Sequence, residues 1–485
     1  MKKSTLYLFG FIVTPLCAFA KQTDKPNVIL IMADDLGWGD VGFNGNRIIR
    51  TPHLDALASD GVVFDRFYAA APLSSPTRAS VLTGRHPFRT GVFSANEGIL
   101  RPEEICLSET LKEEGYATGH FGKWHLGTLT KQGKDANRGG AAYPHLYNPP
   151  VEHGYDIAFV TESKVPTYDP MICPEKNNGR FWNAVTPGES VRDYGTSYWD
   201  IAGNKVTDQV SGDDSRVIMD RVLPFIEDNR LKNQPFLSVI WFHAPHLPCV
   251  ASPQHAAMYQ GFSMEEQNYY GCITAMDEQV GRLVAHLKEL GLYENTLILF
   301  CSDNGPEIGT PGSAGNFKGL KRSLHEGGIR VPAFMVWRKE TPAGKHVAQA
   351  CSTTDYFPTV LDILGHTGST KQALDGESFR RFANGSTRAR SKPLLFGSML
   401  QGAVLESDYK LYYSEGQYEL YNIEEDPFEQ KDLHEVMPKK AKHLKKILYN
   451  QFNEYKDSFD GKEYGTESVK RMKQEWHTIF KNERK

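Results

Sequence analysis

The sequence has few cysteines, no surplus of positive charge and only one long apolar run. Seven cysteines occur in 485 residues, and no two have C-x-x-C spacing, so a metal site built on thiolates is not expected. Lysine and arginine number 55 against 59 for aspartate and glutamate, a formal net charge of −4. Nucleic-acid binding normally requires a basic surplus, so we expect no nucleic-acid partner. With 40% hydrophobic and 24% charged residues, the chain is globular rather than disordered or fibrous.

The single apolar run lies at the N-terminus and is typical of a secretory signal. Lys2 and Lys3 precede apolar residues 6–17, and Ala18-Phe19-Ala20 offers a small-x-small cleavage site. The run is shorter than the ~20 residues of a membrane span. We therefore expect a signal peptide over residues 1–20, Sec-dependent export to the periplasm or the outside, and no transmembrane segment in the mature chain. A retained N-terminal anchor and a lipoprotein acylated at Cys17 are the alternatives.

The pattern of apolar runs predicts an α/β fold with a mostly parallel sheet sandwiched by helices. The expected strands are 28–32, 117–121, 236–242 and 297–300, and the expected helices are 52–60, 107–114 and about 265–290. Residues ~128–215 are rich in Gly, Pro, Asn and aromatics. This composition favours a long ordered excursion across the surface rather than regular helices or strands. Cys272 and Cys301 lie in apolar stretches and are expected in the core, whereas disulfide pairing stays undecided.

The pattern changes after about residue 385. Short strand-like pieces at 394–396, 403–405, 410–413 and 418–421 precede an amphipathic helix at about 436–456. We therefore expect a catalytic domain over residues 21–384 and a smaller α+β subdomain, built on an antiparallel sheet, over residues 385–485.

Each of the four expected strands ends in charged or titratable residues. The first leads into Asp34-Asp35, the second into Lys123-Trp124-His125, the third into His243 and His246, and the fourth into Asp303-Asn304-Gly305. Ligands of open parallel sheets bind beyond the carboxyl ends of the strands, so this coincidence indicates an active-site crevice.

Two of these strand ends carry oxygen ligands. Asp34, Asp35, Asp303 and Asn304 supply three carboxylates and one amide, which suit Ca²⁺ or Mg²⁺ better than zinc. Taken alone, Asp303-Asn304-Gly305 is equally well interpreted as a hairpin turn, because Asn-Gly favours one. A helix N-cap or solvated turn is likewise open for Asp34-Asp35.

The other two strand ends are cationic or titratable. If the strand geometry continues, Lys123 and His125 point to the same face, where they can hold an anion and move a proton. For His243 and His246, one catalytic and one packed histidine is one interpretation, and a metal-ligand pair is another.

The most specific stretch is Pro-Leu-Ser-Ser-Pro-Thr-Arg-Ala-Ser-Val-Leu-Thr-Gly-Arg at residues 72–85. It predicts a helix with a serine N-cap region, Pro76 in the first turn and Gly84 as its end. A helix N-terminus beside Arg78 also favours an anion at Ser74.

Ser74-x-Pro76-x-Arg78, followed by Leu82-Thr83-Gly84-Arg85, resembles the signature of the type I, formylglycine-dependent sulfatases. The resemblance covers nearly the whole mature chain. It includes Asp34-Asp35, the segment 122–127, His246, Asp303-Asn304-Gly305, Lys321 with the segment 326–332, and Leu420-Tyr421-Asn422 with Asp426-Pro427. It implies an alkaline-phosphatase-like fold and a sulfuric ester hydrolase.

The resemblance also implies a set of residue roles. Ser74 would become Cα-formylglycine (3-oxoalanine) through a serine-type radical S-adenosylmethionine maturase before export. One Ca²⁺ would be bound by Asp34, Asp35, Asp303, Asn304 and the residue at position 74. Arg78 and Lys123 would hold the formylglycine oxygens, and His125 would take a proton from the second hydroxyl. His246 would protonate the leaving oxygen, and Lys321, with Lys318 as its rival, would bind sulfate.

Two other functions remain open at this point. A phosphatase or phosphodiesterase of the same fold would place imidazole ligands around two transition metals, and Asp303-Asn304 supplies none. A non-catalytic glycan-binding homologue would have lost some polar site positions, yet all are filled. An exported enzyme of the serine type suits glycan degradation, so we expect a sulfated saccharide substrate, with a galactose- or N-acetylgalactosamine-type sugar favoured.

Overall fold

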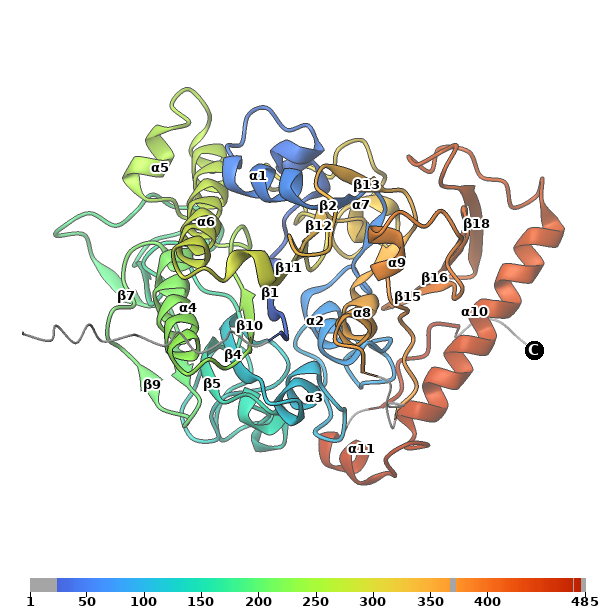
Figure 1. Cartoon of the computed structure of the whole chain (residues 1–485), viewed down its shortest axis with the longest axis horizontal. Helices are drawn as coiled ribbons and strands as arrows, with labels where there is room; N and C mark the ends of the chain where they lie inside the picture. The colour runs from blue at the N-terminus through green and yellow to red at the C-terminus, as the bar shows by residue number, and fades with distance from the viewer. Residues whose placement is uncertain (1–23, 367–371, 474, 481–485) are drawn as a thin grey trace, which may run out of the picture.

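The molecule is built around a ten-stranded sheet (Figure 1). The computed structural model describes residues 24–366, 372–473 and 475–480, so the expected signal at residues 1–20 lies outside the described residues. The strand order is β13-β2-β12-β11-β1-β10-β4-β5-β8-β9. The bounds are β1 (Asn27–Ala33), β2 (Val62–Phe64), β4 (Ala117–Lys123), β5 (Ile157–Thr161), β8 (Tyr198–Asp200), β9 (Lys205–Val206), β10 (Phe236–Trp241), β11 (Thr296–Ser302), β12 (Ala333–Val336) and β13 (Lys345–Val347).

The five central strands are parallel, which confirms the predicted fold class. In register, Ile31 of β1 lies between Ile240 of β10 and Phe300 of β11. Strand β4 continues the parallel arrangement beyond β10, and β5 beyond β4, whereas β12 and β8 are antiparallel to their neighbours. Every residue of β1 is buried, with Ile29 in one hydrophobic cluster and Leu30 in the other. A strand covered on both faces reads as a continuous apolar run, which is why the sequence reveals it.

Helices cover both faces of the sheet, as Figure 1 shows. One face packs against α1 (Pro52–Asp60), α4 (Asp214–Leu231) and α6 (Met264–Glu289), with α5 (Pro253–Ala257) against α6. The other face packs against α2 (Ser74–Thr83), α3 (Leu107–Glu113) and α8 (Tyr356–Ile363). The three helices expected from the sequence at 52–60, 107–114 and 265–290 are confirmed to within one residue.

The segment 128–215 is more regular than the sequence predicts. It contains β5, which pairs with β4 in the central sheet, and β8 and β9 beyond it. A separate hairpin, β6 (Ile172–Pro174) with β7 (Val191–Asp193), lies in the same segment. The apolar run of β5 spans only four residues, from Ile157 to Val160, which is too short to stand out among the surrounding Gly and Pro.

The C-terminal part has the antiparallel sheet that the sequence predicts. Its four strands are β15 (Leu394–Ser398), β16 (Gln401–Glu406), β17 (Tyr409–Ser414) and β18 (Gln417–Asn422), and α10 (Pro438–Phe459) packs on them. The remaining elements are β3 (Phe67–Tyr68), which pairs with β14 (Cys351–Ser352), and the short helices α7 (Glu326–Ile329), α9 (Arg380–Ala383) and α11 (Glu467–Met472). In Figure 1, α10 runs along the outer side of this sheet.

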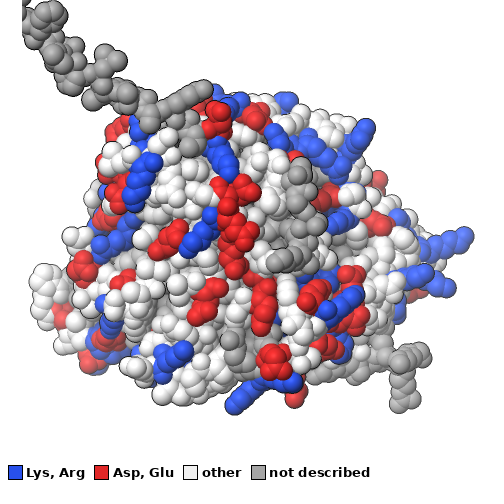
Figure 2. Space-filling view, turned by 60° about the horizontal axis from the view of Figure 1, so that its bottom comes forward, with Lys and Arg blue, Asp and Glu red and all other residues white. Residues whose placement is uncertain are grey.

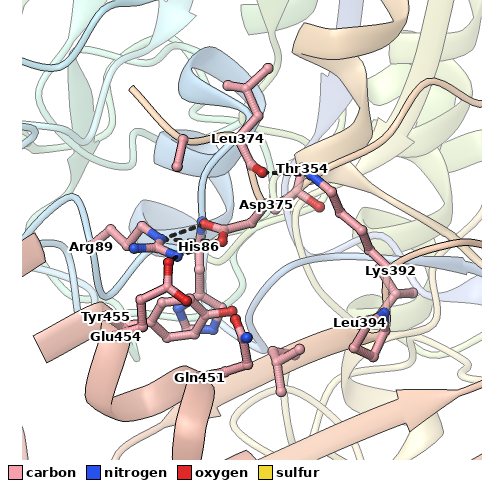
Figure 3. Close-up of a pocket in the computed structure, with 13 residues that line it drawn as sticks. His86, Arg89, Thr354, Leu374, Asp375, Lys392, Leu394, Gln451, Glu454 and Tyr455 are labelled. Atoms are coloured by element: carbon pink, nitrogen blue, oxygen red, sulfur yellow. Dashed lines mark hydrogen bonds and ion pairs between the residues drawn. The ribbon is translucent and has the colours of Figure 1, made fainter. Parts of the chain in front are cut away.

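Ion pairs join the two parts of the chain, and the one between Lys410 and Glu326 is fully buried. Arg89 lines a cavity of about 250 Å³. Its side chain binds Asp375 at 2.9 Å and Glu454 of α10 at 2.7 Å, and Figure 3 draws these residues together. Lys410 of β17 extends toward the part that contains the ten-stranded sheet, where its Nζ lies 2.9 Å from Glu326 Oε1. Removing one partner of such a pair would leave a buried charge uncompensated, so these contacts fix how the two parts are oriented.

The surface carries charges of both signs, and the cysteines of the described chain form no disulfide bonds. On the face in Figure 2, basic and acidic side chains are interspersed, and acidic ones gather in a short central strip. Within the described chain, no helix has both the length and the apolar character needed to cross a membrane. The six cysteines from Cys106 to Cys351 are all buried and free, and Cys272 and Cys301 lie in the core as expected.

Candidate active site

The ends of four parallel strands and the start of α2 meet around Ser74. The Ser74 Oγ atom lies 3.1 Å from Asp34 Oδ1, 3.5 Å from Asn304 Oδ1 and 3.5 Å from Lys123 Nζ. These residues are nearly or fully buried. Residues that are up to 270 positions apart in the sequence, from Asp34 to Asn304, therefore form one compact polar cluster at the expected edge of the sheet.

Ser74 is the first residue of α2 and not its cap. The N-cap is Leu73, which has an extended backbone and whose side chain makes no capping hydrogen bond, so the predicted serine cap is wrong. The Ser74 hydroxyl is instead directed at Asp34. The adjacent Ser75 Oγ donates a 2.7 Å hydrogen bond to the His125 carbonyl oxygen, which ties the start of α2 to the segment after β4. Gly84, with φ of 67°, ends the helix as predicted.

Hydrogen bonds join the segment at Asp35 to the segment at Asp303 and Asn304. Asp35 has a left-handed backbone with φ of 65°, and its N–H donates to Asp303 Oδ1 at 3.1 Å. Asn304 Nδ2 donates to Asp35 Oδ1 at 2.7 Å. The hairpin interpretation of Asp303-Asn304-Gly305 is wrong, because about thirty residues separate β11 from β12.

Each carboxylate of the cluster contacts a cation from another element. Lys123 Nζ lies 2.6 Å from Asp34 Oδ2, and Lys321 Nζ lies 2.7 Å from Asp35 Oδ2. Arg78 Nη2 donates to Asp303 Oδ2 at 2.7 Å, whereas its Nε and Nη1 are buried without a partner among the described residues. Buried donors of this kind normally have an acceptor, so they fit an additional anionic group in the site.

The protonation of the carboxylates reflects their crowding. Burial alone would raise the pKa of Asp34, but Lys123, His246 and Arg78 hold that pKa well below its usual range. Burial and the neighbouring Asp34 charge raise the pKa of Asp303 to about 7. Because the negative charges of Asp34 and Asp303 repel each other, both carboxyl groups are readily ionised together only when additional positive charge is present.

His125 and His246 have different hydrogen-bond partners. His246 Nδ1 donates to the Leu247 carbonyl oxygen at 2.6 Å, and its Nε2 lies 3.6 Å from Asp35 Oδ2. Burial lowers the pKa of His246 to about 4. His125 Nε2 lies 3.1 Å from Asn96 Oδ1, whereas its Nδ1 is buried without a partner among the described residues. Burial and Lys123 hold the pKa of His125 well below its usual range.

His125 reaches this position through a backbone feature that the sequence did not predict. Its φ is 58° and β4 ends at Lys123, so the assumed continuation of the strand is wrong. The side chains of Lys123 and His125 nevertheless face the same site, because the left-handed backbone of His125 turns the chain toward Ser75.

His243 is the packed histidine of its pair. Its Nδ1 lies 2.8 Å from Asp214 Oδ2 and its Nε2 lies 2.7 Å from Thr161 Oγ1. Both nitrogens are therefore engaged, and a metal-ligand pair of His243 with His246 is not what the structure shows.

The geometry also separates the two candidate lysines. Lys318 Nζ points to the C-terminal sheet, where it lies 3.0 Å from Tyr421 Oη and 3.3 Å from Glu419 Oε2. Lys321 is the lysine that belongs to the cluster around Ser74.

A cavity of about 440 Å³ opens above Ser74, and its wall includes residues that the sequence analysis missed. They are Asn96, Asn137, Lys164, Glu307 and Arg322. Each lies in a loop without periodicity, and no motif marks it, so no sequence signal was available to find them.

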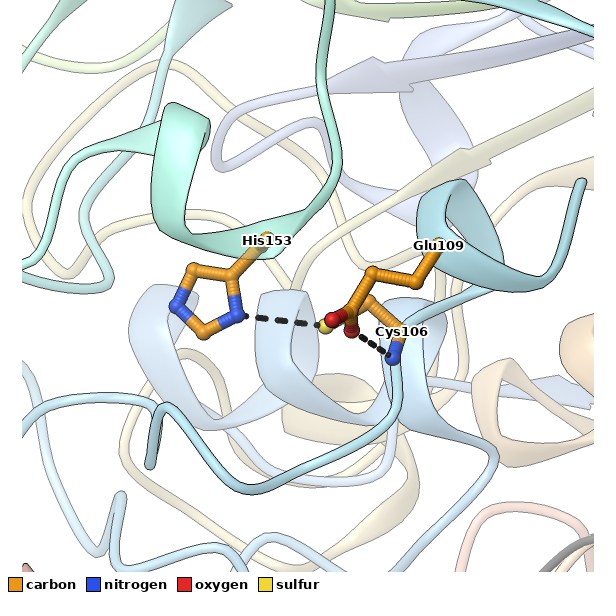
Figure 4. Close-up of side chains that lie close together, drawn as sticks. All are labelled: Cys106, Glu109 and His153. Atoms are coloured by element: carbon orange, nitrogen blue, oxygen red, sulfur yellow. Dashed lines mark hydrogen bonds between the residues drawn. The ribbon is translucent and has the colours of Figure 1, made fainter. Parts of the chain in front are cut away.

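A second group of potential metal ligands lies elsewhere, as Figure 4 shows. Cys106 Sγ lies 3.5 Å from His153 Nδ1, and Glu109 accepts a hydrogen bond from the Cys106 N–H at 2.7 Å. Asn148 Nδ2 lies 2.9 Å from His153 Nε2, which places the ring proton on Nδ1, facing the sulfur. Burial raises the pKa of the Cys106 thiol well above its usual range. We interpret this group as the hydrogen-bonded start of α3.

Comparisons with known proteins identify the family of the chain. The family model described as Sulfatase matches residues 26–366, and that described as N-sulphoglucosamine sulphohydrolase, C-terminal, matches residues 312–458. N-acetylgalactosamine-6-sulfatase of Sus scrofa is 32% identical over 409 residues, which cover 80% of this chain and 72% of that protein. Steryl-sulfatase of Mus musculus is 33% identical over 438 residues, which cover 76% of this chain and 67% of that protein.

A solved structure agrees over almost the whole chain. The crystal structure of Ps i-CgsB in complex with k-i-k-neocarrahexaose matches with a TM-score of 0.76 at 28% identity, covering 92% of this chain and 96% of that one. The extent of these matches confirms the resemblance seen in the sequence. The chain belongs to the sulfatase family and is a sulfuric ester hydrolase.

Proposed function

We propose that this sulfatase hydrolyses O-sulfate esters of a glycan, using a formylglycine at position 74 and a bound calcium ion. The observation that carries the proposal is the position of Ser74 Oγ, within 3.5 Å of Asp34, Asn304 and Lys123. The catalytic domain is proposed to span residues 21–384 and the C-terminal subdomain residues 385–485.

The donor set fits calcium. Asp34, Asp35, Asp303 and Asn304 offer oxygen ligands within one buried cluster, which is the chemistry that a hard divalent cation prefers. Asp34, Asp35 and His246 also present ligand atoms within 4.8 Å of one another, but His246 is assigned to proton transfer. When bound, calcium would supply the positive charge that neutralises the sulfate under attack and lowers the proton affinity of the attacking hydroxyl.

The proposed reaction has two covalent steps. One hydroxyl of the formylglycine hydrate gives its proton to the Asp303 carboxylate and attacks sulfur, the bond from sulfur to the sugar oxygen breaks, and that oxygen takes a proton from His246 and leaves as the alcohol. The second hydroxyl then loses its proton, the carbonyl forms again, and the bond from its carbon to the sulfate oxygen breaks to release sulfate. Water then adds to the aldehyde and restores the hydrate. A plain serine has no second hydroxyl, so its sulfate ester would be hard to cleave.

The residues around position 74 have complementary roles in this scheme. His246 Nε2 faces the acidic cluster, and a bound anionic ester beside it favours the protonated ring that donates to the leaving oxygen. His125 Nδ1 is the free acceptor for the proton of the second hydroxyl. Arg78, Lys123 and Lys321 hold the hydrate and sulfate oxygens through charge-assisted hydrogen bonds.

A glycan is favoured over a steroid as the substrate. The relatives include enzymes named for both N-acetylgalactosamine 6-sulfate and steryl sulfate. The cavity wall, however, is lined largely by hydroxyl, amide and charged groups, among them Ser94, Asn96, Asn137, Ser163 and Glu307. Such groups bind sugar hydroxyls, whereas a sterol needs apolar walls. We propose a galactose- or N-acetylgalactosamine-type sugar.

The test is sulfate release by protein coexpressed with a serine-type radical S-adenosylmethionine maturase. Sulfated saccharides and p-nitrophenyl sulfate and phosphate are the substrates, and mass spectrometry of the Ser74 peptide reports the loss of two hydrogens on conversion. We expect turnover of at least one saccharide by wild type and none by Ser74→Ala. Preferential phosphate turnover with bound zinc would favour the phosphatase alternative, and converted protein without any turnover would favour a non-catalytic homologue. N-terminal sequencing of the exported protein tests removal of residues 1–20 and the periplasmic or secreted location.

A further inference from the structure

Lys164 differs from the other cations that line the active-site cavity. Those cations are Lys321, which pairs with Asp35 at 2.7 Å, and Arg322, whose Nη1 and Nη2 pair with the Glu307 carboxylate at 2.5 and 2.9 Å. Lys164 has neither an ion pair nor a hydrogen bond to any residue that the structure describes. It is nevertheless half-buried. A desolvated ammonium without a partner is unfavourable, so it indicates an anion that binds there.

The backbone around Lys164 is held firmly. Lys164 comes three residues after Thr161, which is paired in register with Lys123. Thr161 Oγ1 donates to the Ser163 carbonyl oxygen at 2.6 Å, and Val165 on the other side is fully buried. Because β5 and β4 are parallel neighbours, Lys164 lies at the same sheet edge as the reacting cluster, on a segment that cannot easily turn away.

The charge environment agrees with this placement. Burial and the Lys321 ammonium lower the pKa of Lys164, and Asp35, Asp34 and Glu307 act on it in the opposite direction. Lys164 therefore interacts electrostatically with the charged cluster around Ser74, but no carboxylate of the described chain forms an ion pair with it. A cavity of about 440 Å³ holds more than one sulfate group, so a sugar bound at Ser74 can present a second substituent to Lys164.

We propose that Lys164 forms a second anion subsite, which binds a carboxylate or a second sulfate on the sugar being desulfated or on its neighbour. The inference rests on the proposed function and narrows it: the substrate is a glycan with more than one negative charge near the reacting ester. Lys164 is a specificity residue in this scheme and takes no part in bond breaking.

The test compares three substrates that share one reacting sulfate. The first is a monosaccharide monosulfate without any other charged group, the second carries a uronic acid next to the same sugar, and the third is the same sugar with a second sulfate. For Lys164→Met we expect kcat/KM to fall by about tenfold to 100-fold on the second or the third substrate, mainly through KM. For the same variant, kcat/KM on the first substrate should change by less than about threefold, and Lys164→Arg should keep most of the activity on all three. Whichever charged substrate responds identifies carboxylate or sulfate as the bound group.

A matched control and a second readout keep the inference separate from the proposed function. Lys176→Met removes an exposed lysine of the same segment and should change none of the three values. Binding to the inactive Ser74→Ala protein, measured by calorimetry with and without Lys164→Met, does not depend on maturation or turnover. Equal losses on all three substrates through kcat would place Lys164 on the reacting sulfate and overturn the inference. No loss of activity or binding with either charged saccharide would also overturn it, whereas wild type that releases no sulfate would contradict the proposed function itself.

Discussion

His125 Nε2 lies 3.1 Å from Asn96 Oδ1, and this contact sets which ring nitrogen carries the proton. A carbonyl oxygen of an amide only accepts hydrogen bonds, so Nε2 is the donor and Nδ1 keeps its lone pair in the neutral ring. Nδ1 is buried and has no partner within the described chain. Asn96 is held in a left-handed conformation with φ of 61°, which asparagine tolerates better than most residues.

Asn96→Ala should therefore reduce turnover more than binding. Without the acceptor, the neutral ring can carry its proton on Nδ1, where it no longer accepts one from the second hydroxyl of the formylglycine hydrate. We expect kcat to fall by about tenfold or more with little change in KM. Asn96→Asp keeps an acceptor and should retain more activity. Asn137→Ala alters another amide of the same cavity and should affect KM instead. An Asn96→Ala enzyme with wild-type kcat would show that the contact does not set the tautomer.

Calcium should stabilise the folded protein if the acidic cluster binds it. A ligand that binds only the native state contributes about 2.7 kcal/mol at a concentration of 100 times its Kd. We expect Tm to rise on adding Ca²⁺ and to fall on adding a chelator. Asp34→Asn should lose most of this response, whereas Asp208→Asn, which makes the same charge change at a side chain that is 73% exposed, should keep it. Equal responses from both variants would contradict calcium binding at Asp34.

Lys318 and Lys321 provide a matched pair of substitutions. Lys321→Ala removes the ammonium 2.7 Å from Asp35 and should lower kcat/KM by about 100-fold. Lys318→Ala removes a contact to Glu419 and Tyr421 on the C-terminal sheet and should change kcat/KM by less than about threefold. The measurement is sulfate release from one saccharide at several concentrations. A larger effect at Lys318 would reverse the assignment.

Most of the site could be predicted because its chemistry coincides with strand ends. The runs before Asp34 and Asp303 are continuously apolar, since both faces of a central strand are buried, so the strands and the polar residues after them are visible together. The motif around Ser74 added the proposed nucleophile, although its serine cap was wrong because Leu73 occupies that position.

The remainder depends on contacts that no local pattern encodes. Strand β5 is short and was missed, and with it the position of Lys164 at the edge of the sheet. His125 reaches the cluster through a left-handed backbone that alternation along a strand cannot predict. Asn96 and Glu307 lie in loops whose conformation is set by tertiary packing, so the wall that decides the substrate was the least predictable part.

His86 should make the wild-type protein sensitive to acid. Its ring is stacked on Tyr455 with centroids 4.2 Å apart, and burial lowers its pKa to about 3 from an unfolded value of about 6.5. Between these values the unfolded chain binds a proton that the native chain excludes, so stability is lost as pH falls below about 6.5. His86→Phe keeps a stacked ring without this titration. Relative to wild type, it should gain about 2 to 3 kcal/mol between pH 7.5 and 4.5, measured by urea denaturation. The lost hydrogen bond from the Phe88 N–H lowers the stability of the variant at both pH values and so cancels in the difference. His145→Phe, at a half-buried position of the 3₁₀ helix Pro144–Leu146, tests whether any histidine substitution has the same effect. A pH-independent difference for His86→Phe would mean that His86 is protonated in the native protein.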